Sequence, residues 1–164
     1  MPPQLVASAV SLATEDIMTQ THHSQMVSVG LPFLIVELRD RSALQRAHTN
    51  ISGLEALRAQ GGSPDVHLYT RATDGFDIRA RMFAPFSGVP EDPATGSANC
   101  ALAGLLAQYS EEPSRSFSWR IAQGVEMGRP STLIARAEKT AGVVQATWVG
   151  GACVLGSEGI IHLT

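Results

Sequence analysis

The sequence carries little charge, and neither sign dominates. Only 16% of its 164 residues are charged, and the formal net charge is −3 at pH 7. Lysine is nearly absent, since Lys139 is the only lysine among twelve basic residues. Proteins that bind nucleic acid or an anionic membrane surface usually concentrate basic side chains in a patch. The composition therefore argues against both kinds of partner.

Cysteine is also scarce. Cys100 and Cys153 are the only two, and they lie far apart in the chain. Their separation matches no metal-ligand spacing, and two cysteines do not make the disulfide-rich scaffold of a small secreted domain. We therefore expect no metal site.

Long hydrophobic runs are missing. The longest, from Leu31 to Val36, is far shorter than the roughly 20 residues that a membrane-spanning helix needs. The N-terminal stretch "MPPQLVASAV" has no basic region followed by an apolar core, so no secretory signal peptide is predicted. We expect a cytoplasmic protein that does not contact membranes. With 44% hydrophobic residues, we expect residues 1–164 to form one domain.

Hydrophobic periodicity predicts both helices and strands. A short amphipathic helix is expected in "PPQLVASAVSL". Two capping-box patterns, Ser42 with Gln45 and Ser52 with Glu55, predict the starts of two further short helices. Strands are predicted in "QMVSVG", "PFLIVEL", "VHLYTRAT", "FDIRARMF", "FSWRIAQG", "STLIARAE", "VVQATWVG", "ACVL" and "GIIHL".

A hairpin is predicted where Asp74-Gly75 separates two alternating segments. In the second segment the apolar side chains face one way, while Arg79 and Arg81 face the other. We expect that second face to meet water or a polar cleft. Short, glycine-rich connections favour antiparallel pairing elsewhere in the chain.

The predicted helix from Ser97 to Gln108 has no polar stripe. A helix that is apolar all round must be buried all round. We therefore predict an α+β fold, with a mainly antiparallel, barrel-like curled sheet around this buried central helix.

The loop before that helix carries the polar groups of most interest. The first backbone N–H groups of a helix lack partners within the helix, and Thr95 or Ser97 are candidates to cap some of them. A carboxylate ligand is expected to accept from the others. Pro93 holds Asp92 extended, which places its carboxylate beside this anion site. Asp92 is suited to hold a polar ligand group or to help move a proton.

A plainer interpretation stays open, because a Thr/Ser-Gly turn before a helix often serves only as a cap. Ser97 is not expected to be a nucleophile, since no Gly-x-Ser-x-Gly elbow is present. His22 and His23 are predicted to be solvated loop residues. Trp148 is predicted to be in the core.

The stretch "RMFAPFSGVPEDPATGSANCALAGLL" resembles the signature of the phenazine biosynthesis-like (PhzF) family. Its hallmark is an Arg-x-Phe-x-Pro strand end, followed by Glu-Asp-Pro-Ala-Thr-Gly-Ser-Ala opening a helix. "QGVEMGRPS" resembles the second signature of the family, and the similarity extends over most of the chain.

The resemblance implies a diaminopimelate-epimerase-like fold, in which two similar domains enclose a cleft. It also implies a cofactor-free isomerisation by proton shift on a small carboxylate-bearing molecule, in a protein that is commonly a homodimer. Carried over to this sequence, Asp92 is the catalytic residue of this half of the site. Gly96 and Ser97, with Thr95, contact the substrate, and the backbone N–H groups of Gly96 and Ser97 face its carboxylate.

One part of the family pattern is missing. The resemblance places the catalytic Glu of the family, with a Gly-Asn-Pro motif, in the N-terminal domain, and this sequence contains no Gly-Asn-Pro. We therefore expect residues 1–164 to correspond to the C-terminal domain alone. Three interpretations follow: half of an isomerase completed by a homodimer partner or a separate N-terminal-half chain, a non-catalytic anion-binding or dimerisation module, or an inactive fragment.

Overall fold

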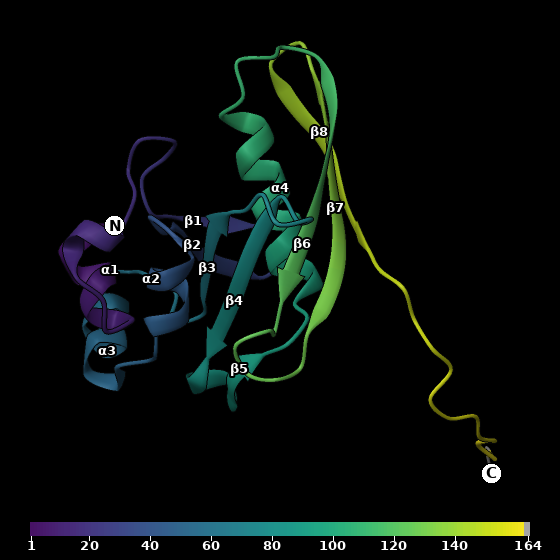
Figure 1. Ribbon diagram of the computed structural model, residues 1–164, viewed down its shortest axis with the longest axis horizontal. Coiled ribbons are helices and arrows are strands. Elements are labelled where there is room, and N and C mark those ends of the chain that lie inside the picture. Colours follow the sequence, from purple (N-terminus) through teal and green to yellow (C-terminus); the bar gives the residue numbers. More distant parts are fainter. Residues whose placement is uncertain (163–164) are drawn as a thin grey trace.

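The computed structural model describes residues 1–162, which form one curled sheet with helices on both faces (Figure 1). The helices are α1 (Pro3–Ala9), α2 (Arg41–Arg46), α3 (Ile51–Ala59) and α4 (Gly96–Gln108), with 3₁₀ turns η1 (Thr14–Asp16) and η2 (Pro85–Ser87). The strands are β1 (Gln25–Ser28), β2 (Pro32–Glu37), β3 (Val66–Arg71), β4 (Ile78–Ala84), β5 (Val89–Asp92), β6 (Arg115–Gln123), β7 (Ser131–Thr140) and β8 (Val143–Gly150).

The strands are joined in the order β1-β2-β3-β4-β6-β7-β8, and β5 pairs with β4. Most neighbours are antiparallel, as predicted, but β2–β3 and β4–β6 are parallel. Each parallel pair needs a long connection. The first connection contains α2 and α3, and the second contains β5 and α4.

Helix α4 lies inside the curl of the sheet (Figure 1) and contacts β1, β2, β6, β7 and β8. Its buried side chains are almost all Ala or Leu, and they join one apolar core with residues from both halves of the sheet. Gly104 allows the close approach of α4 to β8, because a Cβ added at this position would lie only 3.3 Å from Thr147 Cγ2. The prediction of a buried central helix is confirmed.

Helices α1 to α3 cover the opposite face of the sheet with a second apolar core. As a result β4 is buried at every position, and its Arg face meets neither water nor an open cleft. The expectation of a solvated or cleft-facing second side was wrong. The sequence did not reveal that a second helical layer covers this side.

Two local predictions fail at helix starts. Both short helices form, but the N-cap side chains are Asp40, which accepts from Ala43 N, and Asn50, which accepts from Gly53 N. The predicted serines lie inside the helices instead. Asp and Asn cap a helix as well as serine does, and each lies two residues earlier, where the helix begins.

"ACVL" and the described part of "GIIHL", residues 159–162, are not strands, and the last residue of that prediction lies outside the described residues. Residues 151–162 have no paired backbone, and all of them are exposed. The apolar side chains of Val154, Leu155, Ile160 and Ile161 are each at least 84% exposed. Strand propensity alone does not form a strand without a neighbour to pair with.

Two single-residue predictions are also corrected. His22 is buried, with Nε2 2.8 Å from the Tyr69 hydroxyl, because the loop before β1 folds over the end of α4. Trp148 is 50% exposed, because it points outward from β8. No helix in residues 1–162 is both long enough and apolar enough to cross a membrane.

Candidate functional site

The site loop connects the end of β5 to the start of α4. Asp92 is the last residue of β5 and pairs with Met82 of β4, so its backbone is extended, as predicted from Pro93. Thr95 occupies the N-cap position, and α4 begins at Gly96. The loop is therefore held at both ends, by a strand and by a buried helix.

An ion pair anchors the strand that leads into this loop. The Arg81 guanidinium donates Nε to Glu91 Oε1 and Nη2 to Glu91 Oε2, both at 2.8 Å. Its Nη1 donates to the carbonyls of Leu44 and Ala47 at the end of α2. Arg81 thus ties β4, β5 and α2 together directly beside Asp92.

The helix start lacks the cap that its sequence predicts. The Thr95 side chain does not cap α4, because its Oγ1 donates instead to Asp92 Oδ2 at 2.6 Å. The first α4 amide paired within the helix is that of Asn99, which donates to Thr95 O at 3.1 Å. Among the described residues, the N–H groups of Gly96 and Ser97 have no acceptor.

The first turn of α4 contains no acidic side chain to balance those donors. Unpaired N–H groups and the helix dipole together favour an anion at this position. Asp92 lies beside them with one carboxylate oxygen engaged by Thr95 and the other without a partner among the described residues. The loop therefore offers donors for an anion and, next to them, an acceptor for a positively charged or hydroxyl group.

Two buried amide side chains support the loop from below. Gln123 Nε2 donates to Asp92 O at 2.7 Å and to Thr95 Oγ1 at 2.9 Å. Gln123 Oε1 accepts from Thr95 N at 3.3 Å and from Asn99 Nδ2 at 2.7 Å. Both amides are fully buried, so their hydrogen bonds are shielded from water.

His67 lies beneath this pair. It belongs to β3, between Ile35 of β2 and Met82 of β4, on the face that α4 covers. Its side chain is fully buried, and desolvation lowers the pKa of His67 to about 4, opposed by its interaction with Asn99. His67 is therefore a neutral imidazole at neutral pH.

The second motif, "QGVEMGRPS", packs directly against the first. Gly124 has φ +76°, and a Cβ added at this position would lie 2.3 Å from Arg129 O and 2.9 Å from Pro93 O. Its carbonyl accepts from Arg129 N at 2.9 Å, which closes the turn between β6 and β7. Only glycine fits here, because both the left-handed backbone and the contact with Pro93 exclude a side chain.

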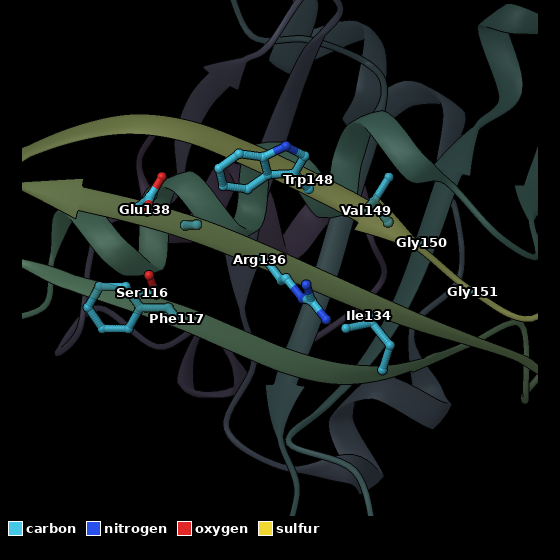
Figure 2. Close-up of a pocket in the computed structure, with 10 residues that line it drawn as sticks. Ser116, Phe117, Ile134, Arg136, Glu138, Trp148, Val149, Gly150 and Gly151 are labelled. Carbon is cyan, nitrogen blue, oxygen red and sulfur yellow. The ribbon is translucent and has the colours of Figure 1, made fainter.

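A hollow of about 510 Å³ opens at the site loop. It is lined by Ala94 and Gly96, by residues 130–133 and by residues 149–153. A larger groove of about 630 Å³ lies on β6, β7 and β8, where Arg136 and Trp148 are exposed, and shares residues 149–151 with the hollow (Figure 2). The larger groove contains none of the predicted site residues, whereas the smaller one includes Gly96.

The structure brings Asp92, Thr95, Gly96 and Ser97 together in one loop at the start of α4. Sequence reasoning missed the residues that support this loop: Arg81 with Glu91 as an anchor, and Asn99, Gln123 and His67 below it. The lone Asn99 in an apolar helix was the available signal, since a buried amide needs partners. Within residues 1–162, no three His, Cys, Asp or Glu side chains are arranged to hold a metal ion.

Comparison with known proteins identifies the family. Residues 3–159 match the sequence profile of the phenazine biosynthesis-like protein family. A trans-2,3-dihydro-3-hydroxyanthranilate isomerase of Pseudomonas aeruginosa is 41% identical over 118 residues, covering 70% of this chain and 42% of that protein. The isomerase of the same name from Pseudomonas chlororaphis is 35% identical, covering 97% of this chain and 52% of that protein.

Solved structures agree on the fold. A PhzF-family phenazine biosynthesis protein of Bacillus anthracis superimposes with a TM-score of 0.75 at 19% identity, covering 91% of this chain and 52% of that one. A predicted epimerase of Pseudomonas aeruginosa gives a TM-score of 0.61 at 28% identity, covering 96% and 53%. The chain spans about half the length of the curated relatives it matches. It belongs to the phenazine biosynthesis-like (PhzF) family, whose curated relatives include named isomerases.

Proposed function

We propose that this chain supplies the carboxylate-binding half of a cofactor-free isomerase site. The reaction is a proton shift on a small, carboxylate-bearing molecule: one carbon loses a proton and another gains one, so the composition is unchanged. The observation that carries the proposal is the uncapped start of α4 beside a carboxylate that Thr95 holds in place.

The substrate carboxylate is assigned to the helix start. Gly96 and Ser97 offer two adjacent backbone N–H groups, and no side chain of the described residues competes for them. A carboxylate has two oxygens that accept such donors, and the helix dipole adds favourable electrostatics. Gly96 also lines the hollow, so a ligand has access to it.

Asp92 is assigned to a neighbouring polar group of the substrate or to proton transfer. Its Oδ2 is fixed by Thr95, which leaves Oδ1 to meet the ligand. Two relatives are named for a reaction on an anthranilate-type molecule, in which an amino group lies beside the carboxylate. This arrangement fits the site, because the start of α4 offers N–H donors to the carboxylate and Asp92 offers an acceptor to the neighbouring amino group.

A second half of the site is proposed to come from another domain or chain, either a homodimer partner or a separate N-terminal-half chain. Two observations support this. The chain spans about half the length of its relatives. Residues 151–153 line the hollow, and the segment beyond them exposes four large apolar side chains, which favours burial against a further surface.

Calorimetric titration with 3-hydroxyanthranilate tests the binding half of the proposal. We expect saturable binding that Asp92→Asn weakens by about 10- to 100-fold, because a hydrogen bond to a charged group is lost while the side-chain volume is kept. Glu111→Gln, which removes a charge from an exposed position, is the matched control and is expected to bind normally. Equal affinity of Asp92→Asn and the parent chain would show that Asp92 is not in the site.

Deuterium incorporation separates the isomerase from the second candidate, a non-catalytic anion-binding module. The candidate substrate is trans-2,3-dihydro-3-hydroxyanthranilate, incubated with the chain in D₂O and analysed by mass spectrometry. Enzyme-dependent uptake of deuterium that disappears in Asp92→Ala supports the isomerase. Binding without uptake contradicts a homodimeric isomerase and leaves the module or a half-site that needs a separate chain. The module is favoured by the absence of a Gly-Asn-Pro motif from this sequence.

A further inference from the structure

The polar groups beneath the site loop have only one consistent arrangement of hydrogens. Gln123 is oriented by the backbone: Oε1 faces the N–H of Thr95, which only donates, and Nε2 faces the carbonyl of Asp92, which only accepts. The orientation of this side-chain amide is therefore fixed by groups that cannot exchange roles.

Asn99 is then fixed in the same way. Its Nδ2 faces Gln123 Oε1 at 2.7 Å and the carbonyl of Thr95 at 2.8 Å, and both of these are acceptors. The oxygen of Asn99 must therefore be on the other side of the amide. That Oδ1 is buried and has no hydrogen-bond partner within the described residues.

His67 is the polar side chain on that side. It interacts with Asn99, but no hydrogen bond joins the two side chains: both His67 ring nitrogens and Asn99 Oδ1 are buried without a partner in the described residues. Its strand neighbours on the same face, Ile35 and Met82, are apolar. Asn99 Oδ1 only accepts and a neutral imidazole carries one N–H, so His67 is the donor that would satisfy this oxygen.

We propose that His67 is a positioning residue for Asp92. The proposed first bond runs from a His67 N–H to Asn99 Oδ1. From there Asn99 donates to Gln123, Gln123 donates to Thr95, and Thr95 donates to Asp92 Oδ2. Every donor in this series of hydrogen bonds points toward the Asp92 carboxylate. The series therefore holds Asp92 as an acceptor and fixes the position of its free oxygen. The inference rests on the proposed role of Asp92, but the chain of hydrogen bonds is testable without a ligand.

The replacement His67→Phe separates positioning from packing. Phenylalanine removes the ring nitrogens and keeps an aromatic ring, somewhat larger than imidazole, in the apolar surroundings, and urea unfolding checks that the variant folds. The Thr95 amide, which donates to Gln123 Oε1, is nevertheless expected to exchange with solvent about tenfold faster, because Gln123 and Asn99 lose their fixed orientation. His67→Gln restores a side-chain N–H donor and is expected to recover most of the protection.

The matched control is His22→Phe. His22 is also a buried histidine, but it contacts Tyr69 and Tyr109 near the far end of α4, about 20 Å from Thr95 along a helix of this length. Both of its ring nitrogens are partnered, so its loss is expected to lower stability and leave Thr95 exchange unchanged. A similar increase in Thr95 exchange in both variants would mean a general loosening and would overturn the inference.

Two further readouts complete the test. In the parent chain, ¹⁵N spectra of His67 near neutral pH are expected to show one protonated and one bare ring nitrogen; a doubly protonated ring overturns the inference even if His67→Phe fails to fold. Affinity for 3-hydroxyanthranilate is expected to fall about tenfold in His67→Phe and to recover in His67→Gln. If neither the parent nor the two His67 variants bind this probe but Thr95 exchange follows the predicted order, the proposed function fails. The positioning role of His67 then stands by itself.

Discussion

Arg81→Met is expected to cost far more stability than Arg79→Met in the same strand, because the partner of Arg81 is mostly buried and that of Arg79 is exposed. Arg81 and Glu91 keep only 10% and 14% side-chain exposure, and removing one partner of a buried pair costs about 3–5 kcal/mol. The lower end applies here, because some exposure remains. The carbonyls of Leu44 and Ala47 also lose their donor, at about 1 kcal/mol each at most. We expect a loss of about 4 kcal/mol in the free energy of unfolding.

Urea unfolding followed by circular dichroism measures this loss. Arg79→Met is the matched control, because Arg79 is in the same strand but pairs with Asp74, whose side chain is 41% exposed. We expect a cost of about 1 kcal/mol there. The double variant Arg81→Met/Glu91→Leu is expected to recover part of the loss, since it removes the unpaired charge as well. A cost of 1 kcal/mol or less for Arg81→Met would refute the view that this pair anchors the site loop.

Three further predictions concern the site loop and the residues that support it. Gly124→Ala is expected to cost about 3 kcal/mol in urea unfolding, because its Cβ collides with the Pro93 and Arg129 backbone; normal stability contradicts that contact. Thr95→Val should weaken 3-hydroxyanthranilate binding about tenfold while Thr95→Ser does not, as measured by calorimetry; equal binding of the two rules out the Thr95 hydroxyl. His67 has a pKa of about 4 when folded and about 6.5 when unfolded, so protons favour the unfolded chain and stability falls between these values as pH drops. Unfolding measured at about pH 7 and pH 4 should show about 3 kcal/mol of this loss in the parent chain and not in His67→Phe; equal losses in both contradict it.

The parts of the fold that depend on local pattern were predictable from sequence. The helix from Ser97 to Gln108 has no polar stripe, and only burial inside the sheet satisfies such a surface. Asp74-Gly75 imposes a turn whatever surrounds it, and β3 and β4 pair as a hairpin around it. The same helix start led to the prediction of a site at residues 92–97, because helix starts have fixed electrostatic properties, and that role stays a prediction.

The parts that depend on packing were not predictable. The burial of Arg81 requires α2 to lie over β4, and nothing in the alternation of the strand specifies that second layer. The interaction of His67 with Asn99 depends on the register of β3 against α4, which brings together residues far apart in sequence. "ACVL" and "GIIHL" have the composition of strands, but pairing needs a neighbouring strand, and in the described residues they have none.

The central claim is that the start of α4 binds a carboxylate. The most direct measurement is a ¹H–¹⁵N spectrum of the labelled chain, titrated with 3-hydroxyanthranilate and, separately, with 2-aminophenol, which is the same ring without the carboxylate. The proposal predicts saturable shifts of the Gly96 and Ser97 amides with the first compound and none with the second. Shifts that appear instead at Trp148 and Arg136, in the larger groove on β6, β7 and β8, or equal responses to both compounds, would contradict it.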